Sequence, residues 1–396
     1  MKVLQICSQP PFPDNNGASK AFLSVANGLL SIGVDLKILS YATPASQPVF
    51  NESSNSFYEK TAYSYVNIEN RVKSIDAFFN LFSKKSYNIS RFVTKEFKDR
   101  LRQILNENEF DIIQFETLFT TPYLETAREF SNAKMVYRSH NIEHLIWERR
   151  AKITKNPLKK RYLNLLAKRL KAFEKKVVND FDAVISITEI DDKIQKEYLN
   201  PGIKTISIPV GFDMAEQNYP QPKDLSLFFI GALDWAPNEQ GLNWFLNNVW
   251  EDIFKKYPKI KFYIAGRNIP AYFQKWADKN VEICGEVPSS SEFIQQHSIM
   301  LVPLFFGSGI RVKIVEAMSF GKVVISTKIG AEGIFSKDSE QILIANSKEE
   351  FIKKISNCIT NPDLTKNISE NAFNFAKENY ENRNLAKKLV AFYNSL

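Results

Sequence analysis

Short apolar runs alternate with longer amphipathic segments along the first half of the chain. Val3–Cys7 is an apolar run, Ala18–Ser31 places apolar residues at helical spacing, and Val34–Leu39 is apolar again. Further apolar runs of strand length are Asp111–Phe115, Lys134–Tyr137, Ala183–Ile187 and Lys204–Ile208. Strands that alternate with helices predict a parallel sheet covered by helices on both faces.

The alternation stops at a polar, proline-bearing stretch, residues 209–224, and then begins again. In the second half, strands are expected over 225–230, 261–265, 281–284, 299–304, 323–326 and 341–345, and helices over 238–254 and 311–320. The sequence therefore predicts an α/β protein made of two doubly wound, Rossmann-like domains. The expected parts are an N-terminal domain over 1–208, the linker, a C-terminal domain over 225–379, and a helix over 380–396 that packs back on the N-terminal domain. Ligands of such sheets bind beyond the carboxyl ends of the strands, so the active site is expected in a cleft between the two domains.

Composition narrows the class of protein. Of the 396 residues, 44% are hydrophobic and 24% are charged, as in ordinary globular proteins. No apolar stretch approaches the ~20 residues of a membrane-spanning helix, and the first residues lack the pattern of a signal peptide. Three scattered cysteines without a CxxC pair argue against a disulfide framework or a zinc site. We expect a cytoplasmic protein without a bound metal or cofactor.

The strongest chemical signal follows the expected strand 299–304. The glycines of Gly307–Gly309 let the backbone approach a ligand, and the helix that begins next offers free N–H groups to an anion. Arg311 and Lys313 add two cations, and Glu316 shares a helix face with Lys313. This arrangement suits a nucleotide diphosphate whose ribose hydroxyls meet the glutamate. An ordinary loop–helix junction with a solvated ion pair would show the same spacing.

Two further candidates lie in the first half. Gly17, after the first strand, lets a phosphate or sugar approach the first helix, although a turn glycine explains it equally well. His140 lies in the segment Arg138–His144, which directly follows the strand 134–137, at an end where sites form. Its imidazole can donate to a phosphate or sugar or move a proton near neutral pH. His144, one helical turn further, is expected to pack in the core, and His297 has no assigned role.

Taken in order, these segments resemble the family-4, group 1 retaining glycosyltransferases of GT-B fold, in their bacterial polysaccharide-assembly branch. The segments that carry the resemblance are QICSQPPFPDNNGASKAFLSVANGLLSIGVDLKILS, FDIIQFETLFTTPYL, MVYRSHNIEHLIWERR, SIPVGFD, FIGALDWAPNEQGLNWF and GSGIRVKIVEAMSFGKVVISTKIGAEGI. They span almost the whole chain, and the last is the most specific.

The resemblance assigns the donor-binding residues. It makes Glu316 the second glutamate of the family's glutamate–seven residues–glutamate motif, which binds the ribose. The first glutamate is replaced by Ser308, so neutral hydrogen bonds are expected at the donor sugar. The family's arginine after the first glycine of its donor-side turn is replaced by Ala232. Arg311, Lys313 and Arg267 are then expected to supply the positive charge for the diphosphate.

The resemblance also assigns roles in the N-terminal domain and a reaction. Gly17 approaches the donor phosphate or sugar, His140 matches the active-site histidine, and Glu116 matches a position that faces the acceptor. The implied reaction moves a sugar from a nucleotide-diphosphate donor, a substrate rather than a cofactor, to a saccharide or lipid-linked saccharide, with retention and without metal. Retention without a protein carboxylate at the anomeric carbon suggests front-face attack.

A basic stripe accounts for most of the net charge of +8. Arg149–Lys176 contains twelve basic residues and one acid, Glu174. Such a stripe either meets an anionic membrane, which would place the site near a lipid-linked saccharide, or is a solvated helix over the sheet. A nucleic-acid partner is not expected, because the C-terminal half is nearly neutral and no nucleic-acid module is present. Two more protein classes fit the same fold: a sugar- or nucleotide-binding protein without transferase activity, and a sugar-nucleotide epimerase.

Overall fold

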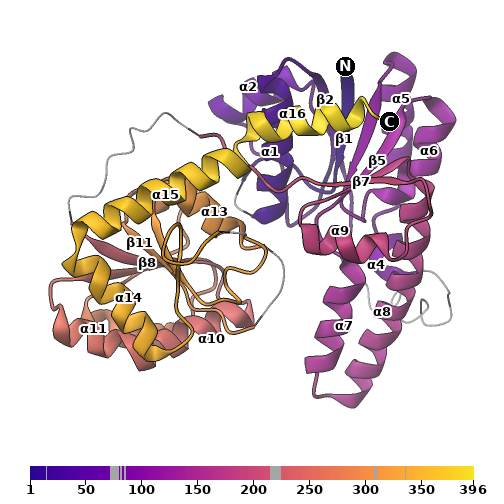
Figure 1. Cartoon of the computed structure of the whole chain (residues 1–396). Helices are drawn as coiled ribbons and strands as arrows, with labels where there is room; N and C mark the ends of the chain where they lie inside the picture. The colour runs from indigo at the N-terminus through magenta and orange to yellow at the C-terminus, as the bar shows by residue number, and fades with distance from the viewer. Residues whose placement is uncertain are drawn as a thin grey trace. The chain divides into compact units, whose positions relative to one another are not determined.

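The chain folds into two compact units, one formed by residues 1–211 with 382–396 and the other by residues 212–381 (Figure 1). The computed structural model describes residues 1–14, 16–71, 80, 83, 86–214, 224–306, 310–334 and 336–396. Most of the expected linker therefore lies outside the described residues. Each unit is an α/β unit with a parallel sheet, as the hydrophobic pattern predicts.

Unit 1 contains a seven-stranded parallel sheet in the order β3-β2-β1-β4-β5-β6-β7. Its strands are β1 (Lys2–Cys7), β2 (Asp35–Ala42), β3 (Ser64–Asn67), β4 (Ile112–Glu116), β5 (Lys134–Ser139), β6 (Ala183–Ser186) and β7 (Lys204–Ser207). The hydrophobic pattern did not predict β3. It is a four-residue edge strand whose residues are all at least partly exposed. Its sequence therefore contains no apolar run from which a strand could be predicted.

Helices cover both faces of this sheet. They are α1 (Gly17–Ser31), α2 (Glu52–Lys60), α4 (Tyr87–Ser90), α5 (Lys95–Glu107), α6 (Leu124–Phe130), α7 (Glu143–Ile153), α8 (Pro157–Val177), α9 (Glu189–Lys196) and α16 (Asn382–Tyr393). Alternate residues of β1 enter opposite cores: Val3 and Cys7 pack with residues of α1 and α16, whereas Leu4 and Ile6 pack with residues of α5 and α8. Gln5, in the middle of β1, is also fully buried, which is unusual for an amide side chain.

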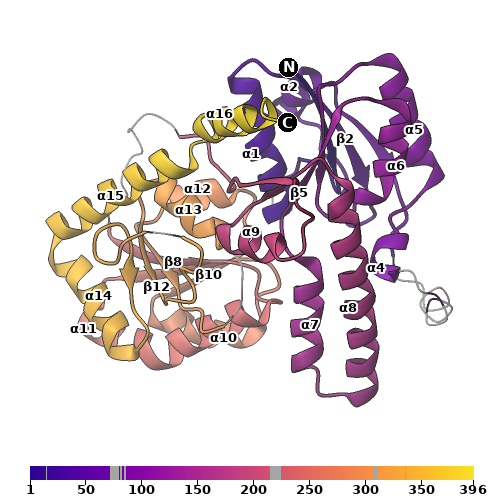
Figure 2. The same cartoon turned by 45° about the vertical axis from the view of Figure 1, so that its right-hand side comes forward.

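The last helix of the chain, α16, packs on α1 within unit 1 (Figures 1 and 2). The two backbones come close at Gly28, where an added Cβ would lie 2.7 Å from the carbonyl oxygen of Asn382 and 3.0 Å from the Cβ of Ala386. The Ser24 hydroxyl also donates to the Asn382 side chain at 2.8 Å. The sequence prediction expected this helix to pack on the N-terminal domain, and the glycine is what permits the close approach.

Two helices of unit 1, α7 and α8, lie side by side as a hairpin (Figures 1 and 2). One face of α8 is buried through Leu163, Leu166 and Leu170. Most cations of the basic stripe Arg149–Lys176 are exposed. No helix in the described part of the chain is both long enough and apolar enough to cross a membrane.

Unit 2 contains a six-stranded parallel sheet in the order β10-β9-β8-β11-β12-β13. Its strands are β8 (Ser226–Ile230), β9 (Lys261–Ala265), β10 (Val281–Gly285), β11 (Ile299–Val302), β12 (Val323–Ser326) and β13 (Leu343–Ile344). Its helices are α10 (Ala236–Phe245), α11 (Glu251–Lys256), α12 (Ser290–Gln295), α13 (Val312–Ser319), α14 (Lys348–Thr360) and α15 (Pro362–Tyr380). The single helix expected over 238–254 is instead α10 and α11 joined by a π-helical turn, Leu246–Trp250.

Candidate functional site

In unit 1, polar side chains gather at the carboxyl ends of β4 and β5. Glu116 is the last residue of β4 and pairs in register with Arg138 of β5, and His140 follows β5 by one residue. Neighbouring parallel strands end at the same edge of a sheet, so these three side chains meet. All three are buried; Glu116 and Arg138 have no exposed surface.

Glu116 is the centre of this cluster. Its Oε1 accepts from the amides of Gln5 at 2.8 Å and Gln114 at 2.6 Å. Its Oε2 accepts from Nη1 of Arg138 at 3.1 Å and lies 2.6 Å from Nε2 of His140. Four side chains therefore hold the carboxylate. The resemblance placed this residue toward an acceptor, but its buried position suits a role that acts through His140.

Burial and the neighbouring charges together determine the protonation state of His140. Burial alone would raise the pKa of Glu116, but Arg138, His140 and Gln5 together lower it to about 2. Burial lowers the pKa of His140, against the opposing effect of Glu116. At neutral pH the imidazole is therefore neutral and the carboxylate is ionised. An ionised carboxylate can only accept, so Nε2 carries the proton and Nδ1 keeps a lone pair that can accept a hydrogen bond.

The beginning of α1 is joined to the same cluster. Nη1 of Arg138 donates to the carbonyl of Ala21 at 3.3 Å, and the ring centroids of Phe22 and His140 are 5.2 Å apart. Gly17 is the first residue of α1, with Asn16 as the N-cap. A Cβ added to Gly17 would meet nothing within 4 Å, so the fold of unit 1 does not require glycine there.

In unit 2, Lys313 of α13 lies at the carboxyl end of β8. Its ammonium donates to the carbonyl of Ile230 at 2.9 Å and to Oδ1 of Asn238 at 3.4 Å, and it lies 4.7 Å from the centroid of the Phe229 ring. Burial, with a smaller effect of Arg311, lowers the pKa of Lys313 to about 7. This lysine is therefore partly neutral at physiological pH.

Gly231 makes room for that ammonium, and Gly266 makes room for the backbone of Gly231. A Cβ at Gly231 would lie 2.7 Å from the amide nitrogen of Asn238 and 3.0 Å from Nζ of Lys313. Gly266, after β9, has φ of +153°, and a Cβ there would lie 1.9 Å from the carbonyl oxygen of Gly231. Asn238 also donates to the carbonyl of Ala232 at 2.9 Å, which ties this turn to α10.

Arg311 and Glu316 are buried on either side of Lys313 along the chain. The Arg311 guanidinium lies over the Trp235 ring, 5.3 Å from the ring centroid, and this cation–π contact helps to orient the guanidinium. Oε1 of Glu316 accepts from the hydroxyls of Ser291 at 2.8 Å and Ser290 at 3.3 Å. The carboxylate is thus oriented before any ligand arrives.

The remaining predicted donor-binding residues are Arg267 and the three residues Gly307, Ser308 and Gly309. Arg267 follows β9; its side chain is exposed and its carbonyl accepts from the backbone N–H of Leu233 at 2.9 Å. Gly307, Ser308 and Gly309 lie outside the described residues.

His144 has a structural role that agrees with the expectation that it packs. Glu174 of α8 accepts from the backbone N–H groups of Glu143 and His144, each at 3.0 Å, and lies 2.7 Å from Nδ1 of His144. Glu174 therefore caps the beginning of α7 from inside the fold. The one acid of the basic stripe is buried and leaves the exposed charge of the stripe positive.

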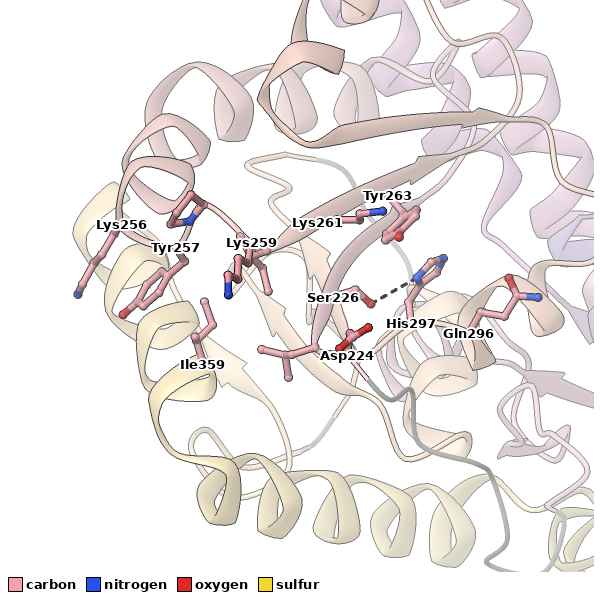
Figure 3. A pocket seen from close by; sticks show the side chains of 13 residues that line it. Asp224, Ser226, Lys256, Tyr257, Lys259, Lys261, Tyr263, Gln296, His297 and Ile359 are labelled. Atoms are coloured by element: carbon pink, nitrogen blue, oxygen red, sulfur yellow. Dashed lines mark hydrogen bonds between the residues drawn. The ribbon is translucent and has the colours of Figure 1, made fainter.

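A cavity of about 890 Å³ opens at the opposite, amino-terminal edge of the sheet in unit 2 (Figure 3). His297 lies against it, with Nδ1 3.4 Å from the hydroxyl of Ser226, and its ring stacks on Tyr263. Three lysines, Lys256, Lys259 and Lys261, also line it. Because β8 and β9 begin here, this cavity is not at the edge where Lys313 and Glu316 lie.

Sequence reasoning missed the residues that hold the candidates in place. Gln5 and Gln114 are amides inside otherwise apolar strands, and such a break in a buried run is a usable signal. Asn238 lies within a segment quoted for the resemblance, but nothing there reveals its contact with Lys313. Among the described residues, no group of three His, Cys, Asp or Glu side chains could hold a metal ion.

Comparisons with known proteins support a glycosyltransferase. Residues 224–361 match the family model of the group 1 glycosyl transferases. The chain is 27% identical over 395 residues to an uncharacterized 44.6 kDa protein in the cps region of Klebsiella pneumoniae, covering 96% of this chain and 97% of that protein.

Solved structures share the fold over the whole chain. Sucrose-phosphate synthase from Thermosynechococcus elongatus superposes with a TM-score of 0.69 at 11% identity, covering 100% of this chain and 98% of that one. Anabaena HepE in complex with UDP-glucose gives a TM-score of 0.62 at 14% identity, with both chains covered completely. The predicted two-domain GT-B fold and the resemblance to group 1 glycosyltransferases are confirmed.

Proposed function

We propose that this protein is a retaining, metal-independent glycosyltransferase that moves a hexosyl group from a nucleotide-diphosphate donor to a saccharide acceptor. The observation that carries the proposal is the trio of buried Arg311, half-buried Lys313 and buried Glu316 at one edge of the sheet in unit 2. The trio lies inside the segment that matches the group 1 glycosyl transferase model. The solved complex of HepE with UDP-glucose supports a nucleotide-sugar donor.

The donor site in this proposal follows from the chemistry of that edge. Glu316 accepts hydrogen bonds from the ribose hydroxyls. Two serines already donate to its Oε1 and orient the carboxylate for this role. Lys313 and Arg311, with the exposed Arg267, face the diphosphate and stabilise the negative charge that grows on it as the sugar leaves. These cations do the work that a divalent metal does in other transferases.

In unit 1, His140 is the proposed catalytic residue. Its neutral imidazole accepts a hydrogen bond from a substrate hydroxyl at Nδ1, while Glu116 holds Nε2. Gly17 leaves open space at the start of α1 for the donor phosphate or sugar. In front-face attack, the acceptor oxygen bonds to the anomeric carbon on the side from which the diphosphate departs. The leaving phosphate oxygen takes the acceptor proton. Because the new bond forms on the face that the diphosphate leaves, the configuration is retained.

The acceptor is proposed to be a saccharide of a cell-surface polysaccharide, carried on a lipid. The relative from the cps region supports the polysaccharide role. The α7–α8 hairpin supports the lipid: its cations are mostly exposed, and Leu158, beside Lys159, is 82% exposed. An exposed leucine among lysines suits the surface of an anionic membrane, and we propose peripheral binding there.

A transfer assay tests the proposed function. Purified protein is incubated with each common nucleotide sugar and a pool of lipid-linked and free saccharides, and release of the nucleotide diphosphate is measured with and without EDTA. We expect release from one donor only, unchanged by EDTA, with an anomeric coupling in the product that matches the donor. Donor turnover without an acceptor would instead favour the epimerase, and binding without turnover would favour a binding protein.

A further inference from the structure

We propose that Tyr393, on the C-terminal helix α16, is a positioning residue for His140 and acts through Gln114 and Glu116. The four side chains form one buried series of hydrogen bonds across unit 1. The catalytic role of His140 rests on the proposed function; the series itself does not.

The first step of the series joins α16 to β4. The phenol of Tyr393 donates to Oε1 of Gln114, and both side chains are buried. Without that donor, the Gln114 carbonyl oxygen would be buried without a partner, which is costly. The phenol therefore holds the amide in place, and the amide nitrogen faces Glu116.

The second step fixes the carboxylate. Gln114 donates to Oε1 of Glu116 at 2.6 Å, and Gln5 donates to the same oxygen at 2.8 Å. The two amides are held in different ways. Gln5 donates to the carbonyl of Phe22 at 3.3 Å as well as to Glu116, but its Oε1 is buried without a hydrogen-bond partner in the described part of the chain. The Gln114 amide is bonded through both its oxygen and its nitrogen, so it links α16 to the carboxylate.

The third step reaches the imidazole. Because Oε1 is held by the amides, rotation of the Glu116 carboxyl group is restricted, and Oε2 stays 2.6 Å from Nε2 of His140. This contact decides which ring nitrogen carries the proton and where the ring points. Loss of the phenol loosens Gln114, then the carboxylate, and finally the orientation of the imidazole.

The series gives α16 a task beyond covering the sheet. Its first residue, Asn382, is held against Gly28 and Ser24 of α1, and its last residue, Tyr393, reaches the cluster at the end of β4. The helix directly follows Glu381, the last residue of unit 2 in the chain. The C-terminal helix is thus a part of the machinery that sets His140.

Nuclear magnetic resonance of the imidazole nitrogens tests the series without any substrate. The chain has three histidines, so a long-range ¹H–¹⁵N spectrum resolves each one. We expect His140 to be neutral with the proton on Nε2, and His144, which faces Glu174 through Nδ1, to carry its proton on Nδ1 as an internal reference.

The test variant is Tyr393→Phe, which keeps the ring and removes the hydroxyl. Its matched control is Tyr41→Phe, which removes another buried phenol, bonded to the Phe119 carbonyl at 2.9 Å and not to Glu116. In Tyr393→Phe we expect the nitrogen signals of His140 to broaden or move toward the tautomeric average. In the control they stay at the wild-type positions.

Two outcomes overturn the proposal: His140 signals in folded Tyr393→Phe that superpose on wild type, or an equal change in Tyr41→Phe. If Tyr393→Phe does not fold, Gln114→Leu breaks the same series from the other side and is judged by the same spectrum. Where a donor is turned over, Tyr393→Phe should lower kcat several-fold and leave the KM for the donor unchanged. A protein without transferase activity would refute the proposed function and leave the spectroscopic result intact.

Discussion

At the scale of single residues, burial decides the charge state of the groups proposed to act. Glu116 is ionised because three partners outweigh its burial, and His140 is neutral because burial outweighs Glu116. Lys313 follows the same rule: with backbone, amide and aromatic partners but no paired carboxylate among the described residues, its pKa falls to about 7. Each state is a property of the packing and could not be predicted from sequence spacing.

The lowered pKa of Lys313 predicts proton uptake on binding a diphosphate. A lysine with pKa about 7 is partly neutral at pH 7.5, and an adjacent anion favours its charged form. Titration of a nucleoside diphosphate in buffers of different ionisation enthalpy should therefore show protons taken up at pH 7.5 and fewer at pH 6. Lys313→Met should abolish the uptake. Equal uptake in wild type and the variant would remove Lys313 from the diphosphate site.

The same group affects stability in a known direction. The folded-state pKa of Lys313 lies below that of an unfolded lysine, so between about pH 7 and pH 10 the unfolded chain binds more protons. The contribution of Lys313 to the free energy of unfolding therefore rises with pH across that range. Lys313→Met should flatten this part of the pH profile of stability, as measured by urea unfolding.

At the scale of elements, apolar periodicity predicted the buried strands well, and two strands, β9 and β12, have the expected bounds. It missed the edge strand β3, whose residues are partly exposed, and the π-helical turn that interrupts the helix expected over 238–254. Both depend on tertiary surroundings rather than on local pattern. The candidate residues were found because they follow apolar strands; their supports, Gln5 and Gln114, lie inside such strands.

The contact between α1 and α16 gives a prediction for an element. Gly28→Val should destabilise unit 1 by about 1–3 kcal/mol, because the added carbons meet the backbone of Asn382, which has little room to move. Hydrogen exchange along α16 should accelerate. Ser31→Val adds a branched side chain at an exposed position of the same helix and should leave α16 protected. Unchanged protection in Gly28→Val would contradict the close packing described for α16.

At the scale of the whole molecule, the chain contains two α/β units, each with a parallel sheet, as its two stretches of strand–helix alternation predict. Charge is concentrated in unit 1, and the structure shows why the stripe stays positive: its one acid, Glu174, is buried under α7. The stripe can be located from the sequence, but only the fold shows that Glu174 accepts hydrogen bonds from the first N–H groups of α7 and is buried there.

The stripe predicts salt-sensitive binding to anionic vesicles. Sedimentation with vesicles rich in phosphatidylserine should carry down the wild-type protein at low salt and much less at high salt, because screened charges attract weakly. Replacing Lys155, Lys159 and Lys160 by Gln should weaken binding by roughly 1 kcal/mol for each charge, and Leu158→Ser should weaken it further. Replacing the exposed Lys255, Lys256 and Lys259 of unit 2 by Gln removes the same number of charges and serves as the charge-matched control. Binding indifferent to lipid charge would refute the membrane proposal.

The central claim is that the edge of unit 2 around α13 binds a nucleotide-sugar donor, and a thermal-shift panel tests it most directly. Wild type and Glu316→Gln are melted with UDP, GDP, ADP, CMP and TDP and with their common sugars, because a ligand that binds only the folded state raises Tm. We expect one base to raise the Tm of wild type, and Glu316→Gln to lose about 1–3 kcal/mol of that binding. No shift with any nucleotide at millimolar concentration, or an equal shift in both proteins, would contradict the account.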